Sequence, residues 1–300
     1  MKKKIHIPVM AFTATLMVFG LTMLFSGCSK EENRTTTVGT AKVTVTFNDF
    51  TITTSDYDGA KDAVADYSGV KAMTLAFFDA NGTVVYNTTQ LRADNTTYTT
   101  FGQFALSLPL GSYTMVALGY GSEVPITLNS ATEAVFTNDR CRETFVASQA
   151  VNVTSTSPLT LNAELSRVVS KVYVRSTDTR LTGVDSVRVT FAAGGKGVNP
   201  QTGLAVSNSG LVNTVGTTTA VGLASSTISY LFLASDQQTM DMTVETIKTD
   251  GTVYSSRTVE DVPLQRNHMT VLRGPLYSNA SGAGFTVSTG WLGDTTFVDF

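Results

Sequence analysis

The chain has little cysteine, histidine and charge, and each shortage excludes a class of function. Its two cysteines are Cys28 and Cys141, so a scaffold of several disulfides is excluded. The two histidines are His6 and His268, and no His or Cys pair has metal-ligand spacing. Charged residues make up 15% of the chain, the net charge is −3 and no basic stripe occurs, so nucleic-acid binding has no electrostatic support.

The first residues have the pattern of a secretory signal. Three lysines follow Met1, an apolar stretch runs from Ile7 to Phe25, and Gly27 precedes Cys28. This order resembles a bacterial lipoprotein signal, in which the bond between Gly27 and Cys28 is cut and the cysteine is lipidated. The alternative is an uncleaved transmembrane helix, because the apolar run is nearly long enough to span a bilayer. We expect a signal peptide over residues 1–27 and a lipidated tether over residues 28–40.

The residues after Cys28 predict where the lipoprotein is sent. Ser29-Lys30-Glu31-Glu32 resembles the Lys-plus-acidic sorting signal of Bacteroidetes lipoproteins. Such a signal implies attachment to the outer membrane through the lipid on Cys28, with the protein exposed on the cell surface. The alternative is that these charges only keep the tether in water.

The rest of the chain has the pattern of short β-strands joined by turns. Val43, Val45 and Phe47 alternate with threonines, which predicts a strand with one buried face. Apolar runs flank Asp79–Gly82 and Thr249–Gly251, which predicts two β-hairpins. Residues 194–220 are expected to form a long, mobile stretch. Short strands without helices between them favour an all-β fold of sandwiches or barrels, with one domain over 41–158 and another over 159–300.

Few residues are candidates for chemistry. His268 is the only histidine after the signal, so a catalytic Ser-His-Asp triad or Cys-His pair would have to use it. Cys141 lies between Arg140 and Arg142, which would favour a reactive thiol, but a buried and inert cysteine is the preferred interpretation. Asp56–Gly59 has the start of a calcium loop without its later carboxylate, so a turn is preferred. We therefore predict no catalytic, cofactor-binding or metal-binding residue and no enzyme activity.

Four segments together carry a resemblance to a known family. They are the lipoprotein signal with its tether, Leu108–Tyr113, Leu165–Val172, and Val262–Gly274 followed by Trp291. The last contains Arg-Asn-His-Met-Thr after a proline. With these segments the chain resembles the fimbrillin superfamily of Bacteroidales, the pilin, anchor and accessory subunits of protease-processed fimbriae. The resemblance implies two tandem transthyretin-like, Greek-key β-sandwich domains. Each segment also has a plain structural interpretation, as a turn, a core aromatic or a surface arginine.

The resemblance implies assembly without chemistry. Subunits of this family join by β-strand addition, after a trypsin-like protease removes the first strand of the pilin. Cutting at Arg34 would leave the strand at Val43–Phe47 in place, whereas cutting at Arg92 would remove that strand together with the first hairpin. This favours a lipid-anchored anchor or accessory subunit, with other fimbrial subunits and a host or bacterial receptor as partners.

Two alternatives to the anchor or accessory subunit stay open. The first is a stalk or tip fimbrillin released by arginine-specific cleavage at Arg34. The second is a surface lipoprotein that binds glycans by stacking sugars on exposed aromatic side chains such as Trp291.

Overall fold

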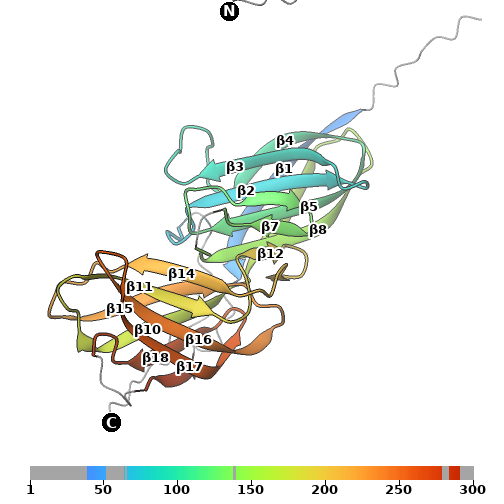
Figure 1. The fold of residues 1–300 in the computed structure, drawn as a ribbon. Coiled ribbons are helices and arrows are strands. Elements are labelled where there is room, and N and C mark those ends of the chain that lie inside the picture. The colour runs from blue at the N-terminus through green and yellow to red at the C-terminus, as the bar shows by residue number, and fades with distance from the viewer. Residues whose placement is uncertain (1–38, 52–63, 65, 138–139, 279–283, 291–300) are drawn as a thin grey trace, which may run out of the picture. The chain divides into compact units, whose positions relative to one another are not determined.

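The computed structural model describes residues 39–51, 64, 66–137, 140–278 and 284–290, all of them within one compact unit (Figure 1). The elements in this part of the chain are β-strands, numbered β1 to β19. None of the described residues form a helix long and apolar enough to cross a bilayer. The predicted all-β class, with sheets arranged as in β-sandwiches, is confirmed.

The first sheet has seven strands, in the order β3-β2-β5-β8-β9-β1-β4. β8 and β9 pair at Phe145–Arg167 and Val146–Ser166, a short contact that joins two halves of the sheet. Side chains from both halves share one apolar core, as in a sandwich. The strands are β1 (Thr40–Thr51), β2 (Ala72–Asp79), β3 (Val84–Leu91), β4 (Gln103–Pro109), β5 (Gly111–Tyr120), β8 (Thr144–Val153) and β9 (Leu159–Arg167).

Two four-stranded sheets enclose a second core. Their orders are β15-β10-β18-β19 and β14-β11-β16-β17. Val172 and Leu272 from the first of them meet Val189 and Val244 from the second in one cluster of buried side chains. The strands are β10 (Ser170–Thr179), β11 (Val184–Phe191), β14 (Leu211–Gly216), β15 (Ala224–Leu231), β16 (Gln237–Lys248), β17 (Val253–Gln265), β18 (Met269–Gly274) and β19 (Thr286–Gly290).

A small sheet connects segments that are far apart in the sequence. Its order is β13-β12-β7-β6, and β12 pairs with β7. A third apolar cluster includes Phe136 and Phe232, whose rings stack with centroids 6.3 Å apart. The strands are β6 (Thr127–Ser130), β7 (Glu133–Val135), β12 (Gly197–Asn199) and β13 (Leu204–Ala205).

The predicted long, mobile stretch over residues 194–220 is wrong, because β12, β13 and β14 lie in it. Two of these strands have only two or three residues, which is too short for a period of two to be visible in the sequence. Backbone hydrogen bonds order the connections as well, such as Val206 N to Gly197 O at 3.1 Å. These residues form strands because they pair with other segments, although no local pattern in the sequence indicates it.

Strand β9 joins the first sheet through a parallel pairing with β1. The register places Leu159 opposite Val43 and Ala163 opposite Phe47. The domain boundary expected between residues 158 and 159 therefore lies just before β9, which belongs to the first sheet. The residues of the second core begin with β10. No local signal in the sequence indicates a parallel partner at such a separation.

Both predicted hairpins are present, between β2 and β3 and between β16 and β17. Gly82 and Gly251 take the left-handed backbone conformation, with φ of 79° and 84°. Asp79 Oδ1 accepts hydrogen bonds from the backbone N–H groups of Asn81 and Thr83, each at 2.8 Å. The turn chemistry therefore fixes both hairpins locally.

Candidate functional site

Several residues predicted to carry function lie outside the described part of the chain. They include Gly27, Cys28 and Arg34, together with the turn at Asp56–Gly59 and Trp291. Signal cleavage, lipidation and proteolytic processing therefore stay predictions from the sequence.

Strand β1 is the element on which assembly by strand addition would depend. It lies between two other strands, antiparallel to β4 and parallel to β9. Val43, Val45 and Phe47 are at most 3% exposed, and the Phe47 ring meets the Phe104 ring edge to face at 6.1 Å. Side chains of this kind stabilise a fold by about 1.5–3 kcal/mol each when buried. Loss of β1 would open an apolar slot bordered by two unpaired strand edges.

Arg92 holds the chain that leads into β2. Its guanidinium donates hydrogen bonds to three backbone carbonyls, those of Val64 at 2.9 Å, Tyr67 at 3.1 Å and Val70 at 2.7 Å. The guanidinium also stands over the ring of Phe101, 4.1 Å from its centroid, and burial lowers its pKa. A protease that recognises arginine must bind this side chain in its own pocket. Binding there would break these hydrogen bonds and the contact with the Phe101 ring.

The segments that carry the family resemblance have structural roles. The Tyr113 hydroxyl donates to the Pro109 carbonyl at 2.8 Å, which fixes the corner between β4 and β5. Asn267 has a φ of 60°, the left-handed conformation that Asn adopts more readily than most residues. The Thr270 hydroxyl donates to the Pro263 carbonyl at 2.9 Å. The Arg-Asn-His-Met-Thr motif is thus the turn that leads from β17 into β18.

A buried ionic cluster lies where β8 begins and β9 ends. Arg167 Nη2 is 2.9 Å from Glu143 Oε1, and their side chains are only 10% and 14% exposed. The Tyr67 hydroxyl donates to Glu143 Oε2 at 2.8 Å. Burial, followed by the charge of Glu143, raises the pKa of Tyr67 to about 12. The sequence offered no signal for this cluster, because isolated polar residues on three segments have no recognisable spacing.

Arg167 and Arg266 lie in the segments that carry the resemblance, where a surface arginine is the plain structural interpretation, and they differ in their surroundings. Arg266 pairs with Asp236 at 2.8 Å, with side chains 32% and 71% exposed, as in an ordinary surface pair. Arg167 is buried with Glu143 instead, so the interpretation as a surface arginine is wrong for this residue.

The candidates for chemistry occupy structural positions. Cys141 is 2% exposed, and burial raises the pKa of its thiol, as expected of an inert cysteine. His268 lies in the turn between β17 and β18, with Nδ1 2.9 Å from the Arg266 carbonyl. Among the described residues, no group of three or more His, Cys, Asp or Glu side chains is placed to hold a metal ion.

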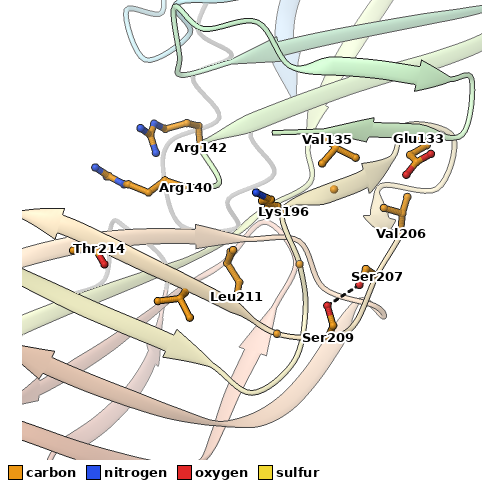
Figure 2. A pocket seen from close by; sticks show the side chains of 14 residues that line it. Glu133, Val135, Arg140, Arg142, Lys196, Val206, Ser207, Ser209, Leu211 and Thr214 are labelled. Atoms are coloured by element: carbon orange, nitrogen blue, oxygen red, sulfur yellow. Dashed lines mark hydrogen bonds between the residues drawn. The ribbon is translucent and has the colours of Figure 1, made fainter. Parts of the chain in front are cut away.

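A pocket of about 820 Å³ lies beside the small sheet (Figure 2). It is lined by Glu133 and Val135 of β7, by the arginines that flank Cys141, and by Lys196. Residues from the end of β13 to β14 complete the lining. In the sequence these arginines stand out only as neighbours of the Cys141 thiol, and the pocket is not predictable there because its walls come from distant segments.

Two solved structures with a similar fold come from Bacteroides ovatus and Porphyromonas gingivalis. An adhesin candidate from Bacteroides ovatus matches with a TM-score of 0.50 and 11% identity, over 85% of this chain and 97% of that one. The fimbrial anchor protein Mfa2 from Porphyromonas gingivalis matches with a TM-score of 0.48 and 13% identity, over 84% and 98%. At such low identity the similarity concerns the fold alone.

Comparison by sequence gives a family without a known activity. No curated protein matches the chain. The profile of a family of unknown function, DUF6562, matches residues 123–298, which is more than half of the sequence. The chain therefore belongs to the DUF6562 family of unknown function.

Proposed function

We propose that this protein is a structural subunit of a cell-surface fibre of the fimbrial type, held in the outer membrane by lipid on Cys28. It is an anchor or accessory subunit that joins other subunits by β-strand addition and catalyses no reaction. The proposed role requires β1 to stay in the subunit. The observation that carries the proposal is the position of the arginines relative to this strand.

Arginine-specific cleavage at the available positions does not remove β1 by itself. Arg34 precedes the strand, and Arg92 is the first arginine after it. Three backbone carbonyls and the Phe101 ring engage the Arg92 guanidinium. A subunit that keeps β1 has its own slot filled, so it terminates a chain of subunits and does not accept a strand there. This behaviour suits the base of a fibre.

Strand addition needs an unpaired edge elsewhere. β3 and β4 are the outer strands of the first sheet, so each has one edge without a partner strand in the described residues. β4 keeps Phe104, Leu106 and Leu108 inward, while Ala105 and Ser107 face solvent. An added strand would gain backbone hydrogen bonds along such an edge.

The test is to purify the mature protein from its own cells and map its N-terminus. The proposal expects Cys28 as the first residue, carrying lipid, and exposure of the protein to antibody on intact cells. A Cys28→Ala variant should leave the membrane fraction, whereas the matched Ser29→Ala variant should stay. An N-terminus at Thr35 would contradict lipid anchoring, and one beyond Thr51 would indicate a stalk pilin that loses β1.

Partners are tested separately. Crosslinking on intact cells followed by mass spectrometry should recover other surface subunits attached at β3 or β4. Recovery of the protein only as a monomer would contradict its role in a fibre.

A further inference from the structure

The pocket in Figure 2 is built from two stretches that are far apart in the sequence, one from Glu133 to Arg142 and the other from Gly195 to Thr214. Arg140 and Arg142 follow β7, Lys196 precedes β12, and Thr214 lies on β14. Its volume of about 820 Å³ is within the range of about 300–1,000 Å³ that is typical of ligand pockets. The wall that contains Gly197 packs closely, because a Cβ at this position would be only 2.7 Å from a side-chain carbon of Val206.

The described residues that line the pocket carry more positive than negative charge. Among them are Arg140 and Arg142 but one carboxylate, that of Glu133, although the whole chain has a net charge of −3. Within the residues that the structure describes, neither arginine forms an ion pair. Burial lowers the pKa of Arg140, and the positive charge of Arg142 lowers it further. An anion bound between the two guanidiniums would offset both the loss of hydration of Arg140 and its repulsion by Arg142.

The opposite side of the pocket is rich in hydroxyl groups. Figure 2 shows the two arginine side chains on one side and the Ser207 and Ser209 side chains on the other. The two serine hydroxyls lie 2.9 Å apart and share one hydrogen bond, which leaves each with further capacity to accept. Thr214 on β14, which lies on the same side as the arginines in Figure 2, adds an exposed hydroxyl. These groups suit a ligand that carries several hydroxyls as well as a negative charge.

We propose that this pocket binds an acidic saccharide, with the carboxylate on Arg140 and Arg142 and the sugar hydroxyls on Ser207, Ser209 and Thr214. A guanidinium binds a carboxylate in a planar, bidentate arrangement, which adds specificity to charge. The inference does not depend on the proposed role in a fibre, since a subunit at any position would carry the same pocket.

Calorimetry on the full mature chain in detergent tests the site with defined probes. Sialyllactose and a hyaluronan tetrasaccharide should bind, whereas lactose, the neutral counterpart of sialyllactose, should not. Arg140→Gln or Arg142→Gln should weaken binding about tenfold or more, because each removes a charge-assisted hydrogen bond. Arg175→Gln, on β10 and outside the pocket, is the matched control and should bind normally.

A steric variant keeps the test informative if an arginine variant fails to fold. Thr214→Trp places a large side chain at an exposed position of β14 and should abolish binding while circular dichroism stays native. The proposal would be overturned if lactose bound with the same affinity as sialyllactose, or if the arginine variants bound sialyllactose as the unmodified protein does. Triglutamate binding as tightly as the sugars would also overturn it, since the pocket would then be a site for acidic peptides. Absence of binding by both acidic sugars would overturn it as well.

Discussion

Glu143 and Arg167 form an ion pair of 2.9 Å with both side chains nearly buried, at the place where β8 and β9 join the two halves of the first sheet. The Arg167 guanidinium also stands over the ring of Phe145, 5.1 Å from its centroid. The ion pair thus lies at the junction of β8 and β9, and β9 pairs with β1 on its other side. One charged pair therefore stabilises the contact between the two halves of the sheet.

Glu143→Gln should destabilise the fold by about 3 kcal/mol, because it leaves the charge of Arg167 buried without a counterion. Chemical denaturation with urea measures the change. Glu245→Gln is the matched control: its partner Arg188 is 34% exposed, and the expected loss is about 0–1 kcal/mol. The double variant Glu143→Gln/Arg167→Met should lose less than the sum of its single changes. Strict additivity would contradict coupling of the pair.

The stability should fall in alkaline solution through Tyr67. Burial and Glu143 raise its pKa from 10.0 in the unfolded chain to about 12 in the folded protein. The unfolded chain therefore loses this proton first, so the stabilisation is complete below pH 10 and is lost as pH rises toward 12. Urea denaturation across this range should show a smaller slope against pH in Tyr67→Phe. An unchanged slope would mean that other groups govern the alkaline transition.

Phe47→Ala should cost about 3–5 kcal/mol, because it leaves a cavity against the Phe104 ring and removes an anchor of β1. Lys42→Ala, on the exposed side of the same strand, should change stability by no more than about 0.5 kcal/mol. Thermal denaturation compares the two variants. A small effect of Phe47→Ala would show that β1 contributes little to the core.

Brief treatment of the folded protein with an arginine-specific protease should leave the bond after Arg92 intact, since the guanidinium is held by the chain at Val64–Val70. Phe101→Ala removes the ring beneath the guanidinium and should speed cleavage there. Mass spectrometry of the fragments identifies the cut. Rapid cleavage after Arg92 in the unmodified protein would remove the main support for a retained β1.

Cys141 should not react with a thiol reagent until the protein unfolds, because its side chain is buried and its pKa is raised. A Cys28→Ala variant leaves it as the only thiol in the chain. A colorimetric thiol assay with and without urea measures the difference. Fast reaction in the folded state would restore the alternative of a reactive cysteine.

The all-β class, both hairpins and the buried face of β1 could be predicted from the amino-acid pattern alone. These depend on a period of two in the side chains and on turn residues such as Asp79 and Gly82, which act within a few positions of the chain. The burial of Cys141 also followed from its residue type, since a free cysteine usually behaves as a small apolar side chain.

The choice of which strands pair depends on packing in three dimensions. The parallel partner of β1 is β9, more than a hundred positions later, and Val198 of β12 pairs with Ala134 of β7, 64 positions earlier, so neither pairing leaves a local pattern. The buried pair of Glu143 and Arg167 and the pocket of Arg140 and Arg142 arise in the same way. Burial and charge at these positions are set by neighbours in space, which a sequence that records only neighbours along the chain does not specify.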